Sequence, residues 1–277
     1  MPELPEVEIT KRHLAPVLGG AMFETVEVTH PRTARHNQGD PSIVVSRLVG
    51  RRALGVGRKG KFLTVPLDND MTMVAHLGMS GRFVVDPEVE VIHTHFRAHL
   101  GNGRSVEFVD PRTFGFIAVF DPEEIETSGL ARIGADAWEN PPGVDTLADS
   151  LRGRVAPIKA LLLDQGPISG LGNIYADESL FLAGIDPLAP GGSLDAGDLE
   201  RLLVAIRQVL ATAIDNGGTS LDDLAYLLPD GRAGENLNLL LVYGRDGEPC
   251  RRCGEIIDRV VIRARSSHFC PGCQAKR

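Results

Sequence analysis

Long apolar stretches are missing from this 277-residue sequence. No run approaches the roughly 18–20 consecutive apolar residues that a membrane-spanning helix needs. A basic leader is missing too, because the chain opens Met-Pro-Glu-Leu-Pro-Glu-Val-Glu and is acidic where a secretory signal would be basic. From these absences we expect no membrane partner, no export, and a cytoplasmic location.

Positive charge is also in short supply, with 29 Lys and Arg against 37 Asp and Glu and a formal net charge of −8. This balance argues against a nucleic-acid partner, because phosphate binding favours a basic surface. The charge is uneven, however: residues 51–61 hold five basic residues and no acid, residues 245–277 hold eight and four, and residues 121–150 hold eight acids and one arginine. Two basic segments can bind a polyanion, although ordinary surface charge explains them equally well.

Cysteine is scarce, and all four cysteines lie in the last 28 residues. They form two Cys-x2-Cys pairs separated by sixteen residues, a spacing that suits a β-hairpin holding one tetrahedral zinc ion. Four thiolates leave no position for water, so the zinc would be structural. Two disulfides are the alternative, but no feature indicates an oxidising compartment. The expected ligands are Cys250, Cys253, Cys270 and Cys273.

The first half of the chain has the pattern of a β-rich domain. Residues 4–18 predict a helix, with Pro5 tolerable in its first turn. Residues 21–120 consist of short β-type runs broken by Gly, Asn and Asp, and residues 71–77 alternate between two faces. We interpret this stretch as an antiparallel sandwich or barrel.

The second half has helical patterns. Residues 121–143, rich in acids and proline, have the composition of an interdomain linker. Two short helices are expected around residues 157–164 and 174–183, with a turn-rich segment between them. An apolar stripe from Leu199 to Ile214 predicts a longer helix, which Gly217-Gly218 would end.

Together these patterns predict an α+β multidomain fold. Its expected parts are an N-terminal β-sandwich with an N-terminal helix (1–130), a helical domain (131–243) and a C-terminal zinc ribbon (244–277).

Five separated motifs occur together and in order: the N-terminal M-P-E-L-P-E-V-E, H-L-G-M-S-G (76–81), D-P-R-T-F-G (110–115), G-L-G-N-I-Y-A-D-E (170–178) and the four-cysteine ribbon. The combination resembles the formamidopyrimidine-DNA glycosylase family, repair enzymes that remove oxidised purines such as 8-oxoguanine. Leu4 favours this purine branch, because the sister endonuclease VIII branch typically has Gly there. The resemblance implies a monomeric glycosylase and lyase acting on damaged double-stranded DNA at the bacterial nucleoid.

The resemblance also implies a covalent mechanism that starts at the N-terminus. After removal of Met1, Pro2 would present a secondary amine that attacks the sugar C1′ and forms an iminium, although a lysine amine can also form a Schiff base. Glu3 is similar to the family's proton donor for sugar-ring opening. Lys61 matches the family lysine that contacts the phosphate beside the lesion and serves in β-elimination. Arg265 matches the ribbon arginine of phosphate binding and δ-elimination.

Further matched positions are expected to bind DNA. Met79, Arg112 and Phe114 match the triad that the family inserts into the duplex when a base is extruded. Asn173, at a predicted helix N-terminus that looks like part of the family's helix–two-turn–helix, would bind phosphate, with a plain N-cap as the alternative. The remaining expected positions are the active-site carboxylate Glu6 and the DNA contacts His76, His93, Arg154 and Lys159.

One segment departs from the family pattern. The loop that closes over the damaged base should lie within residues 219–241, where the family often has Gly-Tyr-Phe and this chain has Gly-Glu-Asn-Leu at 234–237. The reaction type is therefore better determined than the lesion preference. One alternative is an endonuclease VIII-like glycosylase for oxidised pyrimidines. A non-catalytic damage-binding protein is another, but intact Pro2, Glu3, Lys61 and Arg265 argue against it.

Overall fold

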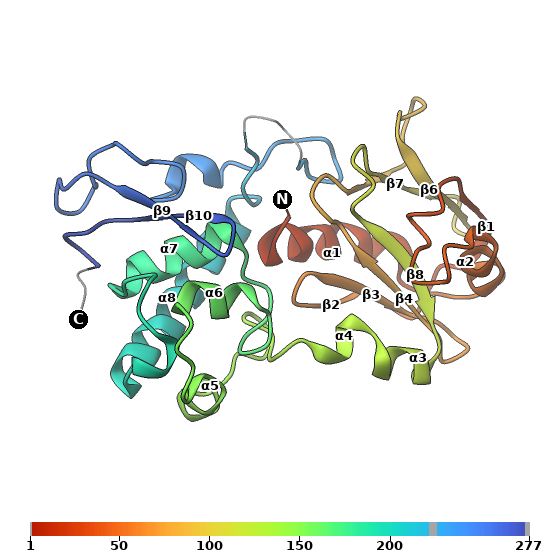
Figure 1. Cartoon of the computed structure of the whole chain (residues 1–277). Coiled ribbons are helices and arrows are strands. Elements are labelled where there is room, and N and C mark those ends of the chain that lie inside the picture. The colour runs from red at the N-terminus through yellow and green to blue at the C-terminus, as the bar shows by residue number, and fades with distance from the viewer. Residues whose placement is uncertain (1, 222–225, 275–277) are drawn as a thin grey trace. The chain divides into compact units, whose positions relative to one another are not determined.

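The computed structural model describes residues 2–221 and 226–274, which form two compact units (Figure 1). The first unit comprises Met1–Arg132 with Asn216–Leu237, and the second comprises Ile133–Asp215 with Asn238–Arg277. The first unit thus takes in a segment that follows the long helix in sequence. The division into three parts at 130 and 243 stays a prediction.

The first unit begins with α1 (Leu4–Leu18), which confirms the predicted N-terminal helix. Pro5 lies in the first turn, where its missing N–H leaves no hydrogen bond unmade. Val7, Leu14 and Leu18 of this helix are buried in the main core.

Two antiparallel four-stranded sheets follow, as the sequence predicted. One has the order β1-β6-β7-β5 and the other β2-β3-β4-β8. The strands of the first are β1 (Phe23–Val28), β6 (Thr94–Leu100), β7 (Ser105–Val109) and β5 (Arg82–Val85). The strands of the second are β2 (Gly57–Lys59), β3 (Phe62–Pro66), β4 (Thr72–His76) and β8 (Phe116–Phe120). A further helix, α2 (Pro41–Leu48), starts at the N-cap Asp40.

The main core contains aromatic residues of the first sheet, including Phe23, Phe96 and Phe108, and aliphatic residues of the second, including Leu63 and Ile117. Strand alternation accounts for this arrangement, because every second side chain of each strand points to the same face.

The predicted linker at 121–143 is wrong in its first part. Residues there form α3 (Pro122–Thr127) and α4 (Gly129–Arg132). Asp121 caps α3 by accepting a hydrogen bond from the Glu124 N–H, and the Asp121 N–H in turn donates to the Glu124 carboxylate. Ile125 and Leu130 pack on the outer face of the second sheet, so both faces of β4 are covered.

The second unit contains α5 (Val144–Leu151), α6 (Ile158–Leu163), α7 (Asn173–Ala183), a short 3-10 helix η1 (Gly191–Ser193) and α8 (Ala196–Asp215). The helix pair and the long helix were both predicted. Gly217 and Gly218, just after α8, have φ of 73° and 78°, so the left-handed backbone ends the helix as expected. Another short 3-10 helix, η2 (Asn236–Leu239), follows in the chain.

The chain ends in a two-stranded antiparallel hairpin of β9 (Asp258–Ile262) and β10 (Arg265–Phe269). Arg263 and Ala264 form its turn with positive φ values of 45° and 60°. This is the β-hairpin predicted between the cysteine pairs.

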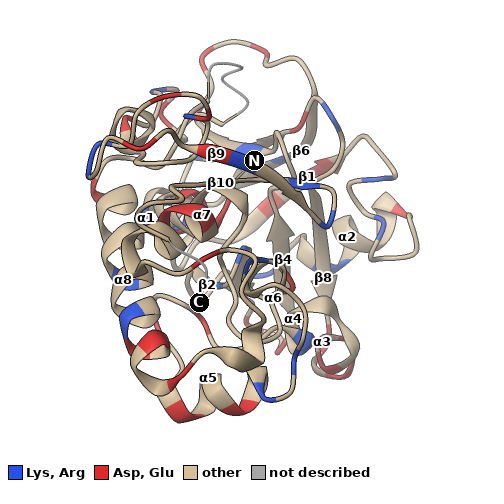
Figure 2. Cartoon of the chain, turned by 60° about the vertical axis from the view of Figure 1, so that its left-hand side comes forward, with Lys and Arg blue, Asp and Glu red and all other residues tan. Residues whose placement is uncertain are grey.

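Charge is distributed unevenly within each unit (Figure 2). The acidic segment 121–150 lies largely on exposed parts of α3 and α5, and the hairpin exposes Arg259, Arg263 and Arg265. Among the described residues, no helix has the length and apolar character needed to cross a membrane.

Candidate active site and zinc centre

The first turn of α1 is held by reciprocal hydrogen bonds. Glu3 is the N-cap residue: its side chain accepts from the Glu6 N–H, and its own N–H donates to Glu6 Oε2 over 2.7 Å. Pro2, Glu3 and Glu6 are all buried. This cap fixes the backbone beside the predicted nucleophile.

The other Glu6 oxygen binds a segment far along the chain. The Thr219 N–H donates to Glu6 Oε1 over 2.8 Å, across a separation of 213 residues. Gly218 has φ +78°, and a Cβ there would lie 2.8 Å from the same oxygen, so glycine permits the approach. Nearby, Tyr226 packs on Ile9 of α1. One carboxylate therefore joins the first turn of α1 to the predicted base-covering loop.

The divergent sequence at 234–237 is part of this hydrogen-bonded loop. The Gly234 N–H donates to Ser220 Oγ over 2.8 Å, and Asn236 Nδ2 donates to Thr219 Oγ1 over 2.9 Å. Residues 222–225 of the predicted loop lie outside the described residues. The Gly-Glu-Asn-Leu sequence therefore still forms hydrogen bonds with residues 219–220 at the start of the loop.

A buried ion pair joins α1 to the hairpin that carries Lys61. Arg58 in β2 is fully enclosed, and its Nε lies 3.0 Å from Glu8 Oε2. Gly60 and Lys61 form the turn between β2 and β3, and Arg58 Nη1 donates to the Gly60 carbonyl. Burial alone would raise the pKa of Glu8, but hydrogen bonds from three basic side chains outweigh it and hold this pKa below its ordinary value. Part of the basic segment 51–61 therefore stabilises the fold.

His76, at the end of β4, has an aromatic and cationic environment. Its ring centroid lies 5.0 Å from that of Phe62 and 5.9 Å from that of Phe116. Burial, and next the charge of Lys61, lowers the pKa of His76 to about 4. Its Nδ1 accepts from the Gly78 N–H over 3.0 Å, which leaves Nε2 as the donor of a neutral ring.

Two loops carry the three predicted wedge residues. Met79 follows β4, whereas Arg112 and Phe114 precede β8. Asp110 joins the loops, because its carboxylate accepts from Ser80 Oγ and from a backbone N–H of the second loop, each over 2.6 Å. Phe114 is 42% exposed, and the Arg112 Cζ lies 5.3 Å from its ring centroid.

The close approach of these loops depends on Gly78. It has φ +64°, and a Cβ there would lie 2.4 Å from the backbone carbon of Phe114. Asp110 belongs to the D-P-R-T-F-G motif, but sequence reasoning assigned it no role. The sequence signal for such a role was its position between Met79 and Arg112, two of the predicted wedge residues.

His93 is exposed immediately before β6 and has φ +64°. Its carbonyl accepts from the Asp110 N–H over 3.0 Å, which places it beside the second wedge loop.

In the second unit, α7 begins at Asn173 with Gly172 as its N-cap, so the plain N-cap alternative for Asn173 is wrong. Asn173 Oδ1 is buried and accepts no hydrogen bond from any described residue. The preceding turn is braced by Gln165, whose Nε2 donates to the Leu171 carbonyl over 2.7 Å and whose Oε1 accepts from the Gly170 N–H over 2.9 Å. Sequence reasoning did not identify this brace.

The two predicted DNA contacts near α6 differ in exposure. Arg154 is exposed before the helix. Lys159 has no exposed side-chain surface, and its Nζ lies 2.6 Å from Asp177 Oδ1 of α7.

Glu178, another residue that sequence reasoning missed, fixes the chain entering the zinc ribbon. Its carboxylate accepts hydrogen bonds of 2.8–2.9 Å from the backbone N–H groups of Leu241, Val242 and Tyr243. Burial raises the pKa of Glu178, and these three hydrogen bonds oppose the increase. The sequence signal for this role was a carboxylate on the side of the predicted helix that is expected to be buried.

The four cysteine sulfurs lie within 4.8 Å of one another. The Sγ atoms of Cys250 and Cys273 are 4.0 Å apart, and those of Cys253 and Cys270 are 3.3 Å apart. A tetrahedral ion with Zn–S bonds of about 2.3 Å would separate its sulfurs by about 3.8 Å, so these donors fit one zinc ion. All four are free cysteines, so the disulfide alternative is wrong.

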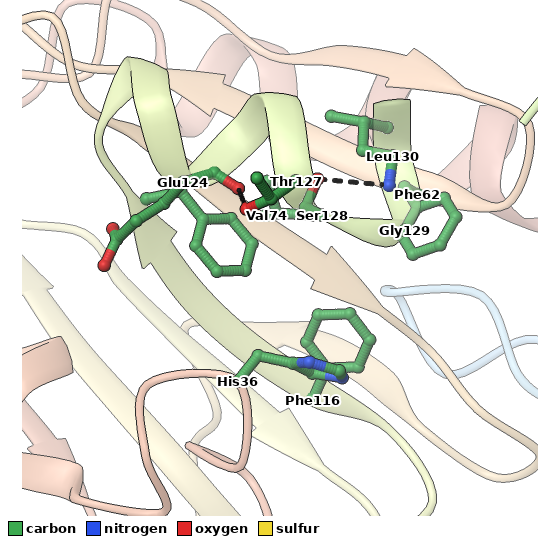
Figure 3. A pocket seen from close by; sticks show the side chains of 10 residues that line it. His36, Phe62, Val74, Phe116, Glu124, Thr127, Ser128, Gly129 and Leu130 are labelled. Atoms are coloured by element: carbon green, nitrogen blue, oxygen red, sulfur yellow. Dashed lines mark hydrogen bonds between the residues drawn. The ribbon is translucent and has the colours of Figure 1, made fainter. Parts of the chain in front are cut away.

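A pocket of about 340 Å³ lies elsewhere in the first unit, between the outer face of the second sheet and the α3–α4 segment. Figure 3 shows the rings of His36 and Phe116 side by side in it, and the hydrogen bond from the Leu130 N–H to Ser128 Oγ. Its walls are mostly apolar and include none of the predicted catalytic residues.

Known proteins match this chain along its whole length. Three family models match in order: the formamidopyrimidine-DNA glycosylase N-terminal domain at residues 1–117, its H2TH domain at 133–224, and the zinc finger found in FPG and IleRS at 247–276. A formamidopyrimidine-DNA glycosylase of Corynebacterium jeikeium is 40% identical, with 99% of this chain and all of that protein covered. The chain belongs to the formamidopyrimidine-DNA glycosylase family.

Solved structures of the family share the fold. The MutM (Fpg) protein of Thermus thermophilus is 39% identical, with a TM-score of 0.88 over the whole of both chains. The Lactococcus lactis Fpg in complex with Fapy-dG-containing DNA is 31% identical, with a TM-score of 0.87 over 99% of this chain and all of that one. The predicted α+β multidomain fold is confirmed, and so is one structural zinc ion on the four cysteines.

Proposed function

We propose that this chain excises oxidised purines, such as 8-oxoguanine and formamidopyrimidines, from duplex DNA and then cleaves the strand through a Schiff base on Pro2. It is a DNA glycosylase with lyase activity at the resulting abasic site, and it acts as a monomer. Family membership over the full chain supports this proposal, as does the complex of the Lactococcus lactis relative with Fapy-dG-containing DNA. We place the activity in the bacterial cytoplasm, at the nucleoid, because duplex DNA is the substrate.

The observation that carries the proposal is the double role of Glu6. Its two oxygens bind the Glu3 N–H and the Thr219 N–H, so the residues beside the nucleophile and the loop over the base share one buried carboxylate. Such a link favours a reaction in which the amine and the damaged base must be held together.

The chemistry follows from a secondary amine at position 2. The Pro2 nitrogen attacks C1′, and the base leaves with the electron pair of the glycosidic bond and takes up a proton. Glu3 gives a proton to O4′ as the sugar ring opens to the iminium. Loss of a C2′ proton then expels the 3′ phosphate, and Lys61 serves this β-elimination. Loss of a C4′ proton then expels the 5′ phosphate in a δ-elimination that Arg265 serves, and water finally hydrolyses the iminium and frees Pro2.

The remaining residues hold the duplex in this proposal. Lys61, Arg265 and Asn173 bind phosphates, and neutral His76 donates from Nε2. The exposed Phe114, with Met79 and Arg112, fills the gap left by the extruded nucleotide and so offsets the lost stacking. His93 and Arg154 add peripheral contacts.

The Gly-Glu-Asn-Leu sequence at 234–237 favours one second candidate, a preference for oxidised pyrimidines, because this segment belongs to the loop over the base. The two candidates share the covalent mechanism and differ in the lesion that gives the fastest excision.

Borohydride trapping tests both points. The mature protein is incubated with duplexes containing 8-oxoguanine, an oxidised pyrimidine or no lesion, then reduced and digested, and the adduct is mapped by mass spectrometry. We expect an adduct on the N-terminal peptide, fastest with 8-oxoguanine. Pro2→Gly should change trapping, whereas Pro5→Ala, the matched control in the same turn, should not. An adduct on a lysine, or none with any lesion, would contradict the proposal.

A further inference from the structure

Lys159 and Asp177 form an ion pair with no exposed side-chain surface. Their Nζ and Oδ1 atoms lie 2.6 Å apart. Removing two charges from water is costly, and such a pair is maintained only when further hydrogen bonds satisfy it. The partners of those hydrogen bonds therefore show which segment of the chain the ion pair fixes in position.

Hydrogen bonds connect both charged groups to β10. Lys159 Nζ donates to the Ser266 carbonyl over 2.8 Å. Asp177 accepts from Ser267 Oγ over 3.0 Å and from the His268 N–H over 2.9 Å. The pair thus connects α6 and α7 to three consecutive residues of one strand, which lies against α7 (Figure 1).

These three residues directly follow Arg265, which is exposed at the start of β10. The zinc ligand Cys270 lies at the other end of the strand, about 17 Å from Arg265 at about 3.3 Å per residue. Zinc alone would hold the hairpin by one end and leave the turn at residues 263–264 unsupported. The ion pair supplies the second attachment, one residue from Arg265.

We propose that Lys159 and Asp177 are positioning residues for Arg265 and that Lys159 does not itself bind DNA. The inference rests on the proposed function, in which Arg265 serves δ-elimination. In that step water takes up the C4′ proton, the electron pair of the C4′–H bond enters the conjugated iminium, and the 5′-side phosphate leaves with the electron pair of the C5′–O bond. A guanidinium held at that phosphate neutralises the leaving group. A displacement of the strand would weaken this step and leave the earlier steps at Pro2 intact.

The test measures the ratio of β,δ-elimination product, which ends in a 3′ phosphate, to β-elimination product on a duplex with a preformed abasic site. Lys159→Met should lower this ratio by about tenfold or more, since a displacement of about 1 Å can cost a hundredfold in rate. Borohydride trapping should change far less. Arg152→Met, which removes an 80% exposed arginine directly after α5, is the matched control and should leave the ratio unchanged.

Two further measurements separate positioning from other roles. In an Arg265→Ala background, Lys159→Met should produce no further drop in the ratio. In the same Arg265→Ala background, Lys159→Met should leave the salt dependence of DNA binding unchanged, whereas loss of a direct phosphate contact by Lys159 would lower the log–log slope further, by about 0.9. Where Lys159→Met fails to fold, the double variant Lys159→Met/Asp177→Leu replaces the pair by apolar side chains and keeps the core filled.

An unchanged ratio in folded, zinc-replete Lys159 variants would overturn the inference while leaving the proposed function intact. A further decrease in the salt slope on Lys159→Met in the Arg265→Ala background would overturn it in favour of direct DNA contact. Absence of any trapped adduct or elimination product from the wild-type chain would instead refute the proposed function, and the inference with it.

Discussion

Arg58→Met removes the guanidinium that Glu8 faces inside the first unit. Arg58 is fully enclosed and Glu8 is 4% exposed, so among the described basic residues the carboxylate keeps Lys11 and Arg12 of its own helix as partners. Removing one member of a buried ion pair costs about 3–5 kcal/mol. For a domain of this size, each kcal/mol lowers the unfolding midpoint by about 2–4 °C, so we expect a decrease of about 6–20 °C.

Arg12→Met is the matched control, because Arg12 binds the same carboxylate over 2.9 Å but is 51% exposed. An exposed pair contributes about 0–1 kcal/mol, which corresponds to about 0–4 °C. Burial is the main difference between the two arginines, so the contrast measures its effect.

Thermal unfolding followed by circular dichroism at pH 7, with zinc present, checks the prediction. A Glu8→Leu/Arg58→Met double variant should recover much of the loss, because it leaves no unpaired buried charge. Equal decreases for Arg58→Met and Arg12→Met would refute the reasoning that burial decides the free energy of unfolding.

Three further outcomes are expected. Zinc should be present at one ion per chain, and its removal should disorder β9 and β10 and abolish DNA binding; reduced, active protein without zinc by elemental analysis would contradict this. Arg265→Ala should lower the log–log salt slope of DNA binding by about 0.9, whereas Phe114→Ala should leave the slope unchanged and reduce discrimination between damaged and undamaged duplexes. The folded-state pKa of His76, about 4, lies below its ordinary value of 6.5, so the unfolded chain binds the extra proton and stability should fall as pH decreases from 6.5 towards 4. Unfolding midpoints of His76→Phe should show a flatter dependence over that range, and an unchanged dependence would count against the shifted pKa.

Local patterns account for what could be predicted from the sequence. The helix at 4–18, the long helix that Gly217 ends and the hairpin between the cysteine pairs each depend on spacing within about 20 residues. The helices α3 and α4 were also readable, because Asp121, Pro122 and Glu124 form a helix start. The acidic and proline-rich composition of residues 121–143 led instead to the prediction of a linker.

Long-range contacts account for what could not be predicted. Glu6 binds Thr219, Asp110 joins two loops, and Glu178 binds the chain before the ribbon, yet none of these pairings follows from spacing. The burial of Lys159 is of the same kind. The sequence matches Lys159 to a DNA-contacting position of the family, and the burial of its side chain comes from the packing of α6, α7 and β10.

The bond between Glu6 and Thr219 has a consequence for synthesis of the chain. The first turn of α1 leaves the ribosome early, but its carboxylate finds the second N–H only after more than two hundred further residues have been made. Until then the apolar Ile9 side chain also lacks the cover that Tyr226 provides. The sheets can therefore form before the contacts of the first turn of α1 are complete. A fragment ending at Arg132 would contain both sheets but leave Glu6 Oε1 without the Thr219 N–H. Formation of the contacts of Glu6 with Thr219 and of Ile9 with Tyr226 is therefore a late, non-local step in the folding of the first unit. We expect it to be slow relative to formation of the hairpins.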